Sequence, residues 1–406
     1  MPPARAPTTA LLAGLALSLG AHAASIDRAA EASLQVEVLA NGLDTPWGLA
    51  LLPDGRMLVT ERTGALLLLD AQGARIATIK NVPEAFVKLQ GGLLDVVLHP
   101  KFESNSTLYL SLAHGRQKHN TTRVVRAVLD GDALRDVQVI FDNTPKGTAV
   151  HYGARLAFLP DGTLLVTTGE GADYREQAQR LDVVLGKIVR INDDGSIPAD
   201  NPFVNTPGAH PAIWSYGHRN PQGLYVDAQT ATVYSAEHGP MGGDEINVIE
   251  RGVNYGWPIA THGIDYSGAR ISPFETYDGM REPLLFWTPS IGPGGLALYR
   301  GAMFPEWEGD LIVAVLGHKH LRRVDLENGR VVRQERLLQD RNARFRQVVT
   351  GTDGAIYAVV ENVDEAERSG QILKITRATN PPATDESLPP STSATSTQAP
   401  LQATSR

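Results

Sequence analysis

A strand–turn–strand pattern that recurs along the chain is the feature that most constrains its fold. Each copy has an apolar strand, a turn that often contains Asp-Gly, and a second strand that ends in polar residues. The copies are separated by roughly 45 to 80 residues, which suits one four-stranded blade plus its loops. The six copies begin at Gly48, Gly92, Ala154, Gly223, Gly295 and Phe345. This pattern predicts an all-β protein, a six-bladed β-propeller of four-stranded antiparallel blades. Two stacked β-sandwiches are the alternative, but they would not require this spacing.

The two ends of the chain differ in composition from the repeats. An apolar run after Arg5 ends in Ala21-His22-Ala23, which predicts a signal peptide over residues 1–23 and a periplasmic or secreted protein. The run is too short to span a bilayer, and a short buried helix is its alternative interpretation. Residues 24–35 are predicted to be a linker and residues 36–376 the propeller. Residues 377–406 are rich in Pro, Ser and Thr, which predicts a disordered tail.

Charge and cysteine usage exclude several classes of function. The net charge of -8 argues against binding to nucleic acid or to an anionic membrane surface. The chain has no cysteine, so it has no disulfide, thiol nucleophile or thiolate metal site. An anionic ligand would therefore need a local basic pocket.

Four basic residues at predicted strand ends could form such a pocket. They are Arg219 in "GHRNPQG", Lys319 in "LGHKH", and Arg344 and Arg346 in "ARFRQ". A propeller gathers strand ends around one axis, and residues two apart on a strand share a face, with Phe345 on the other. Guanidinium groups pair well with carboxylates, so the cluster favours a ligand with several carboxylates. The alternative is that these cations pair with Asp and Glu of the loops.

A second set of residues suggests proton transfer. His151 lies at the entry of the third repeat, where a neutral imidazole can accept a proton, although a single strand histidine is more often structural. Glu170 follows the next strand and is either a partner for such a base or a loop charge. Gln90 lies just before the first strand of the second repeat.

The segment "SAEHGPMGGDEINVIERGVNYGWP" is rich in oxygen donors. Asp244, Glu245, Asn247 and Asn254 are close in sequence, and the glycines around Pro240 allow backbone carbonyls to turn outward. Oxygen ligands without cysteine favour calcium over zinc or copper. A polar loop between blades, capped by Asx turns, explains the same pattern without a metal.

Several motifs, in order, carry a resemblance to a known family. They are "GLLDVVLHPKF", "HYGARLAFLPDG", "GHRNPQGL", "EHGPMGGDEIN", "NYGWP" and "LGHKHLRRV". The region from about Val36 to Ile375 resembles the soluble quinoprotein glucose/sorbosone dehydrogenases, in particular the aldose sugar dehydrogenase branch. The resemblance implies a six-bladed propeller that uses pyrroloquinoline quinone (PQQ) and calcium to oxidise the anomeric carbon of aldoses to lactones. It also implies that electrons pass to an external acceptor.

The resemblance assigns roles to individual residues. His151 would take the proton of the C1 hydroxyl while hydride passes to the quinone, and Arg219 would lie near the quinone carbonyls. The residues implied to hold the cofactor are Gln90, Arg219, Asn220, Tyr266, Gly317, His318, Lys319, Arg344, Phe345 and Arg346. The implied calcium ligands fall into a catalytic and a structural group, which are Gly239 with Pro240, and Glu245 with Tyr255.

The chain departs from the family pattern at one position beside the implied base. Members that act best on glucose have an acid there, whereas this chain has Val150, which together with short loops after Asp95 and around His262 predicts broad aldose acceptance. A calcium-dependent lactonase or hydrolase is an alternative, but it gives no reason for four cations at strand ends. An exported propeller that binds glycans or a partner is another, but the aromatic content is only 6%. The sequence leaves the choice between a monomer and a homodimer open.

Overall fold

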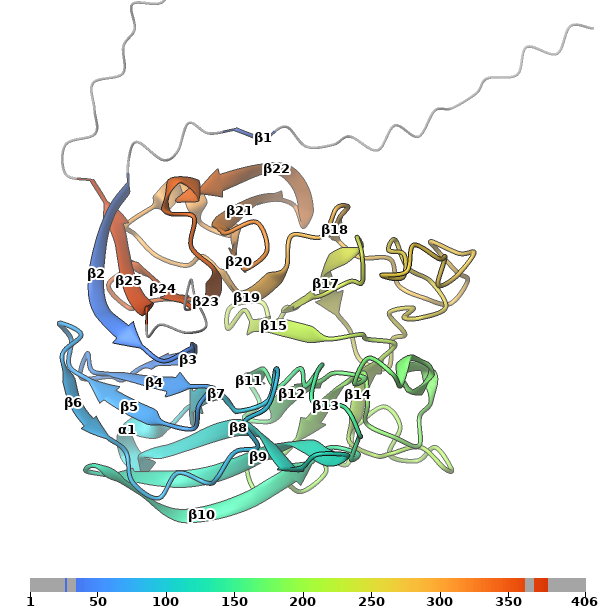
Figure 1. Cartoon of the computed structure of the whole chain (residues 1–406), viewed down its shortest axis with the longest axis horizontal. Helices are drawn as coiled ribbons and strands as arrows, with labels where there is room; N and C mark the ends of the chain where they lie inside the picture. Colours follow the sequence, from blue (N-terminus) through green and yellow to red (C-terminus); the bar gives the residue numbers. More distant parts are fainter. Residues whose placement is uncertain (1–25, 28–33, 362–368, 379–406) are drawn as a thin grey trace, which may run out of the picture.

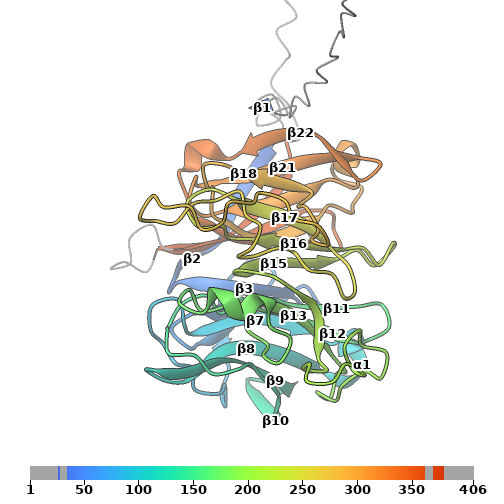
Figure 2. The same cartoon turned by 90° about the vertical axis from the view of Figure 1, so that its right-hand side faces the viewer.

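Six β-sheets, each with an antiparallel core of four strands, form a closed ring in the computed structural model of the chain (Figure 1). The structure describes residues 26–27, 34–361 and 369–378. The six-bladed propeller predicted from the repeats is confirmed, because each repeat begins within two residues of the start of the first strand of one blade. The predicted signal peptide and most of the predicted tail lie outside the described residues. Figure 2 shows the same ring turned by 90°.

The blades follow one another along the chain. Blade 1 comprises β3 (Pro46–Leu51), β4 (Met57–Glu61), β5 (Leu66–Leu69) and β6 (Arg75–Thr78). Blade 2 comprises β7 (Leu93–Leu98), β8 (Thr107–Arg116), β9 (His119–Asp130) and β10 (Ala133–Asp142). Blade 3 comprises β11 (Leu156–Phe158), β12 (Leu164–Thr168), β13 (Lys187–Ile191) and β14 (Ile213–Tyr216). Blade 4 comprises β15 (Pro221–Val226), β16 (Val233–Glu237), β17 (Asp244–Ile249) and β18 (Leu285–Trp287).

The last two blades also recruit strands from the start of the chain. Blade 5 comprises β19 (Pro293–Leu298), β20 (Leu311–Val315), β21 (His320–Glu327) and β22 (Arg330–Leu337), and β1 (Ile26–Asp27) pairs in parallel with β22. Blade 6 comprises β23 (Phe345–Thr350), β24 (Ile356–Val360) and β25 (Gly370–Arg377), with β2 (Leu34–Leu43) as its outer strand. In the described residues the helical segments are α1 (Phe102–Asn105), η2 (Arg175–Gln179), η3 (Pro305–Trp307) and η4 (Gln339–Arg341).

Pairing of β2 with β25 closes the ring. The two strands are antiparallel, with Leu34 opposite Arg377. Strand β2 therefore begins inside the predicted linker 24–35, and β25 ends on the first residue of the predicted tail. Backbone hydrogen bonds between the start and the end of the propeller hold the last blade in place, and they cover a sheet edge that would otherwise be open.

The blades pack face to face around the axis. The second strands β4, β12 and β20 are buried at every position, because each sheet is covered on both faces by its neighbours. Near the axis the first strands approach closely: a Cβ at Gly48 would lie 2.9 Å from the carbonyl oxygen of Leu94 in the next blade. Glycine there allows the first strands of adjacent blades to touch, so their ends converge on a single axial region.

Candidate functional site

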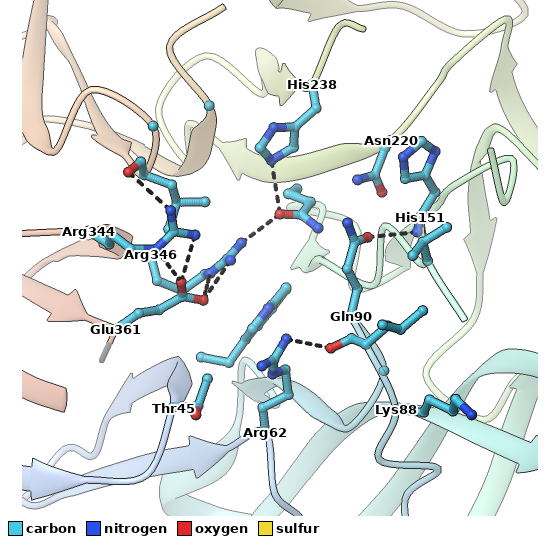
Figure 3. Close-up of a pocket in the computed structure, with 18 of the residues that line it drawn as sticks. Thr45, Arg62, Lys88, Gln90, His151, Asn220, His238, Arg344, Arg346 and Glu361 are labelled. Atoms are coloured by element: carbon cyan, nitrogen blue, oxygen red, sulfur yellow. Dashed lines mark hydrogen bonds and ion pairs between the residues drawn. The ribbon is translucent and has the colours of Figure 1, made fainter. Parts of the chain in front are cut away.

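A pocket of about 990 Å³ opens at the axis, where the first strands of the blades begin (Figure 3). Every blade contributes a lining residue from the start of its first strand or from the segment just before it. In blade order these residues are Trp47, Gln90, His151, Asn220, Gly292 and Arg346. The segments just after the second strands of blades 4, 5 and 6 add Gly239, Gly317 and Glu361. The propeller thus gathers side chains that are far apart in the sequence.

One side of the pocket carries a surplus of guanidinium groups. Arg346 is buried, and its Nε donates to Glu361 at 2.7 Å while a terminal nitrogen donates to Gln222 Oε1 at 2.6 Å. Arg344 contacts the other oxygen of Glu361 at 3.2 Å. Burial raises the pKa of Glu361, but the two arginine charges outweigh it and hold the pKa below its usual value. Two guanidinium groups therefore share one ionised carboxylate, and Arg62 lines the same pocket.

His151 forms a close pair with Glu170 at the pocket wall. The imidazole Nδ1 lies 2.7 Å from Glu170 Oε2, and the His151 backbone N–H donates to Gln90 Oε1 at 2.8 Å. Burial lowers the pKa of His151, and the charges of Arg219 and Lys146 lower it further, while Glu170 partly offsets them. Burial raises the pKa of Glu170, but its hydrogen bond to His151 and nearby positive charges bring it below the usual value.

These directions define the protonation of the pair at neutral pH. Glu170 is ionised and His151 is neutral, so the proton of the imidazole lies on Nδ1, facing the carboxylate. Nε2 is then the nitrogen with a free lone pair. The sequence left Glu170 as either a partner or a loop charge, and the structure places it as the partner of His151.

Arg219 and Asn220 form the wall between blades 3 and 4. Arg219 donates to the backbone oxygens of His238 at 3.1 Å and Gly239 at 2.8 Å, and its guanidinium lies 5.4 Å from the ring of Trp257. Asn220 Oδ1 accepts a hydrogen bond from the Gly153 backbone at 3.1 Å. The segment "HRNPQG" therefore supplies one cation to the pocket and ties blade 4 to the segment that carries His151.

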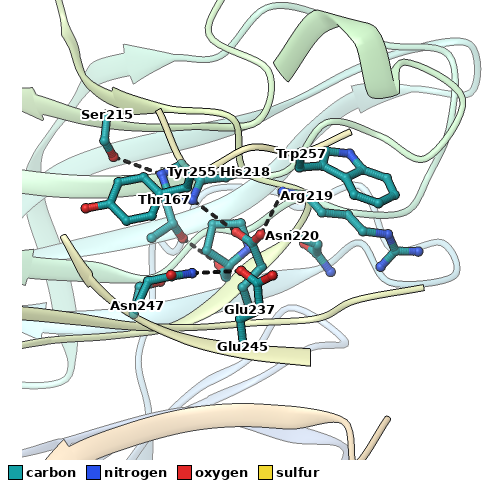
Figure 4. Close-up of polar contacts among 12 residues, drawn as sticks. Thr167, Ser215, His218, Arg219, Asn220, Glu237, Glu245, Asn247, Tyr255 and Trp257 are labelled. Carbon is teal, nitrogen blue, oxygen red and sulfur yellow. Dashed lines mark hydrogen bonds and ion pairs between the residues drawn. The ribbon is translucent and has the colours of Figure 1, made fainter. Parts of the chain in front are cut away.

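A buried chain of polar contacts runs behind Arg219 (Figure 4). Ser215 Oγ lies 2.9 Å from His218 Nε2, and His218 Nδ1 lies 3.1 Å from Glu237 Oε2. The other oxygen of Glu237 accepts the Arg219 backbone N–H at 3.1 Å. The Ser–His–Glu order is that of a hydrolase triad, but Ser215 and His218 have no exposed surface, so no substrate reaches them. The chain instead holds the backbone of Arg219.

Glu245 lies beside Glu237 in the same buried region (Figure 4). The two residues are cross-strand neighbours on β17 and β16, and Asn247 Nδ2 donates to Glu245 Oε2 at 3.1 Å. Burial and the Glu237 carboxylate raise the pKa of Glu245 to about 8. Within the described part of the chain, the buried Asn247 Oδ1 has no hydrogen-bond partner. Tyr255 stacks on His218, and its hydroxyl is paired with both Glu250 and Val248.

The other residues implied to hold the cofactor fall into two groups, those that line the pocket and those that do not. Tyr266 and Gly317 line the pocket, and Tyr266 is 72% exposed at its rim. Three implied residues, His318, Lys319 and Phe345, do not line it. His318 and Lys319 lie on the turn after β20. Phe345 is fully buried in the apolar core between blades 5 and 6, because its side chain points away from the face that Arg346 shares with Arg344.

Several lining residues were not predicted from the sequence. They are Trp47, Arg62, Gln222, His238 and Glu361. A recurring glutamate in the sequence could have predicted the carboxylates. In four blades the second strand ends in a glutamate or is soon followed by one, in the segments "LVTE", "VTTGE", "YSAE" and "AVVE". These residues are Glu61, Glu170, Glu237 and Glu361. The recurrence of glutamate at the same place in a repeat indicates a shared position near the axis.

The fold and the pocket define a propeller whose axial site combines a proton acceptor with guanidinium groups suited to an anionic ligand. The chain belongs to the glucose/sorbosone dehydrogenase family, whose model matches residues 43–374. This confirms the family predicted from the motifs.

Relatives support the same assignment over nearly the whole propeller. Aldose sugar dehydrogenase YliI of Escherichia coli is 40% identical over 354 residues, covering 86% of this chain and 94% of that protein. The apo crystal structure of the E. coli soluble aldose sugar dehydrogenase superposes with a TM-score of 0.81 at 38% identity, covering 85% of this chain and all of that one. The PQQ-bound aldose sugar dehydrogenase of Streptomyces coelicolor gives 0.71 at 30% identity, covering 86% and 99%. The chain is thus a homologue of oxidoreductases. No helix in the described residues is long and apolar enough to cross a membrane.

Proposed function

We propose that this protein oxidises aldose sugars at C1 to the lactone, with PQQ and calcium as cofactors and an external electron acceptor. The observation that carries the proposal is the His151–Glu170 pair, which faces a pocket containing more guanidinium than carboxylate groups. Similarity to a PQQ-bound aldose sugar dehydrogenase supports the choice of cofactor.

The donor set of the pocket fits an anionic quinone. Arg344 and Arg346, with Arg62 close by, would pair with its carboxylates, and Arg219 with Asn220 would donate to its ring oxygens. The surplus of positive charge beside Glu361 is the feature that a ligand carboxylate would neutralise. When bound, the quinone supplies the two-electron acceptor that the side chains themselves lack. Lys319 and His318 do not line the pocket, so the structure gives them no contact with a ligand bound there.

His151 and its neighbours would carry the proton transfer. Nε2 of the neutral imidazole would take the proton of the C1 hydroxyl of the sugar. Glu170 holds the tautomer that leaves Nε2 free and stabilises the imidazolium that results. The Arg219 guanidinium would stabilise negative charge that develops beside the base.

The region around Glu245 is the part of the described structure that best fits a calcium ion. No three His, Asp or Glu side chains converge on a metal site within the described ranges, so a cation would rely on backbone and amide oxygens. Near Glu245, the unpartnered Asn247 Oδ1 and the two adjacent carboxylates form a site that a cation would stabilise. The Tyr255 hydroxyl is already paired, which leaves its backbone oxygen as a ligand. At the proposed catalytic position, Gly239 and Pro240 oxygens accept hydrogen bonds from Arg219 and Ser290.

Glu245→Gln is expected to weaken stabilisation by calcium. In the natural protein, calcium at 100 times its Kd would add about 2.7 kcal/mol of stability and raise the Tm by several degrees. The substitution removes the carboxyl group that would lose its proton and bind the cation, so the calcium-dependent rise in Tm should shrink. Glu250→Gln is the matched control, because Glu250 is half-exposed and paired with Arg281. An unchanged calcium response in Glu245→Gln would place the ion elsewhere.

Reconstitution tests the function as a whole. Purified protein is mixed with calcium and PQQ, and reduction of a redox dye is followed with glucose, galactose, xylose and maltose. We expect a change in the absorption spectrum of the quinone and turnover with several aldoses. The dehydrogenase proposal fails if no aldose reduces the dye and the quinone spectrum is unchanged. Hydrolysis of a lactone with calcium alone would support the hydrolase alternative instead.

We also propose export of the protein and removal of residues 1–23. Sequencing the N-terminus of the mature protein tests this, because a chain that still begins at Met1 would contradict it. Sedimentation at several concentrations would decide between the monomer and the homodimer.

A further inference from the structure

The backbone around His151 is strained and needs support. His151 has a φ of +51°, and Ala154 three residues later has a φ of +73°. Residues other than glycine rarely occupy this left-handed region, and each costs of the order of 1–3 kcal/mol unless the surroundings enforce it. Gln90 and Asn220 each fix one backbone N–H of the segment. The Gln90 backbone N–H also donates to the Ala149 carbonyl at 3.1 Å, so the carbonyls of Thr148 and Val150 are the ones that need another partner.

Lys146 supplies that partner. Its Nζ donates to the backbone oxygens of Thr148 at 2.8 Å and Val150 at 2.7 Å, the residue directly before His151. The same ammonium lies 3.7 Å from the centre of the Tyr152 ring, directly after His151. One side chain therefore contacts the residues on both sides of the imidazole.

The position of Lys146 is itself well defined. Its backbone pairs with Asn120 at the start of β9 through hydrogen bonds of 3.0 and 2.8 Å. Asn120 Oδ1 accepts from the Tyr152 hydroxyl at 2.7 Å and lies 3.4 Å from the Lys146 ammonium. A rigid strand of blade 2 thus anchors the lysine, and the lysine anchors the segment that carries His151.

The charge of Lys146 has no direct counterion. Lys146 is 2% exposed, and in the described ranges no carboxylate forms an ion pair with it. A buried cation without a partner is costly, so a neutral side chain would be the cheaper way to hold backbone oxygens. Burial accordingly lowers the pKa of Lys146 to about 7, and Glu170, the partner of His151, is the charge that opposes this.

We propose that Lys146 is a positioning residue for His151, which holds the backbone on both sides of the imidazole and places a positive charge beside the His151–Glu170 pair. The inference rests on the proposed role of His151 as the base. The charged groups around the imidazole are Glu170 after β12, Arg219 before β15, and Lys146. His238 after β16 stays neutral, because burial lowers its pKa well below the usual value. Lys146 is protonated over the acidic range in which His151 titrates, so it disfavours the imidazolium.

Lys146→Gln tests the effect of the charge while keeping a hydrogen-bond donor. The titration of His151 is followed by NMR in protein without quinone, calcium or sugar, and its signal is assigned by its loss in His151→Ala. Without the lysine charge the imidazolium is less disfavoured, so the titration midpoint should move to higher pH. The acid limb of kcat/KM in the reconstituted enzyme should move the same way, and kcat should fall about 10- to 100-fold through misplacement of the base. Lys146→Arg, which keeps the charge, should restore the midpoint.

Lys187→Gln is the matched control. Lys187 is also a buried lysine whose Nζ donates to three backbone oxygens, those of Gln177, Ala178 and Leu185, and its pKa is likewise lowered to about 7 by burial. The Lys187→Gln variant should lose stability as Lys146→Gln does, but the titration midpoint of His151 should not move.

Tyr152→Phe is the alternative variant if Lys146→Gln does not fold. It keeps the lysine charge and breaks the hydrogen bond to Asn120, so it should lower kcat while the titration midpoint of His151 stays unchanged. A midpoint that does not rise in Lys146→Gln, or a kcat that does not fall in Tyr152→Phe, overturns the inference. Full activity of His151→Ala would instead overturn the proposed role of His151 as the base, and a failed reconstitution would overturn the proposed function.

Discussion

His151→Ala is expected to lower kcat by ~10²-fold or more while PQQ binding is retained, as is typical of the loss of a general base. His151 faces the pocket, but its hydrogen bonds go to Glu170 and Gln90 rather than to the arginines that would hold the cofactor. Quinone affinity, measured by titration of its absorption spectrum, should therefore change little. Full turnover in this variant would show that another group takes the proton.

The pH dependence of the natural enzyme gives an independent check on His151. The base acts in its neutral form, so kcat/KM should fall as the pH drops through the pKa of the imidazole. Burial lowers that pKa, which places the acid limb below the usual value of about 6.5 for histidine. An acid limb above that value would mean that the group controlling activity is not a buried histidine with this environment.

Replacing Arg344 and Arg346 together by alanine is expected to weaken PQQ binding at least about 10²-fold. Removal of each guanidinium would eliminate a charge-assisted contact to the ligand, worth about 1.5–3 kcal/mol. Glu361 would also be left buried without its two partners and would repel the anionic quinone. The measurement is the Kd of PQQ, with kcat compared at saturating cofactor.

Replacing both arginines is also expected to lower the stability of the fold, so two control variants separate stability from PQQ affinity. A buried carboxylate without its partner costs about 3–5 kcal/mol, and adding Glu361→Gln to the double variant should recover part of this loss in stability. It should also remove the repulsion of the quinone, but PQQ affinity should stay well below that of the natural protein, because the arginine contacts are still missing. Arg56→Ala removes an arginine that pairs with Asp54 on the surface, and it should change neither property. Unaltered PQQ affinity in the double variant would exclude these arginines from the cofactor site.

The sequence predicted the propeller because its evidence is local. Short apolar strands recur in every blade, Asp-Gly turns between the first two strands, such as Asp161-Gly162, recur in three of them, and each repeat begins at or near the first strand of one blade. Closure of the ring was not predicted, because pairing of β2 with β25 joins segments at opposite ends of the propeller. No periodicity within either segment reports on such a partner.

Part of the site was also predicted, because the alternation of side chains along a strand is a local property. Strand alternation predicted that Arg344 and Arg346 would lie together, and they share Glu361. Alternation also placed Phe345 on the opposite face, and its burial in the core agrees with that rather than with its implied contact to the cofactor. Lys319 follows a strand that reaches the pocket, yet it does not line the pocket itself.

Residue types and their order along the chain were enough to predict six blades, a cationic axial region and a histidine able to accept a proton. The pairing of His151 with Glu170, and the division of Glu361 between two arginines, depend on the packing of strand ends from different blades. The protonation of the His151–Glu170 pair follows from that packing, because burial and neighbouring charges shift a pKa. Neither can be read from the residues next to His151 in the sequence. The tertiary structure therefore decides which of the predicted polar residues have the charge and the partners that chemistry requires.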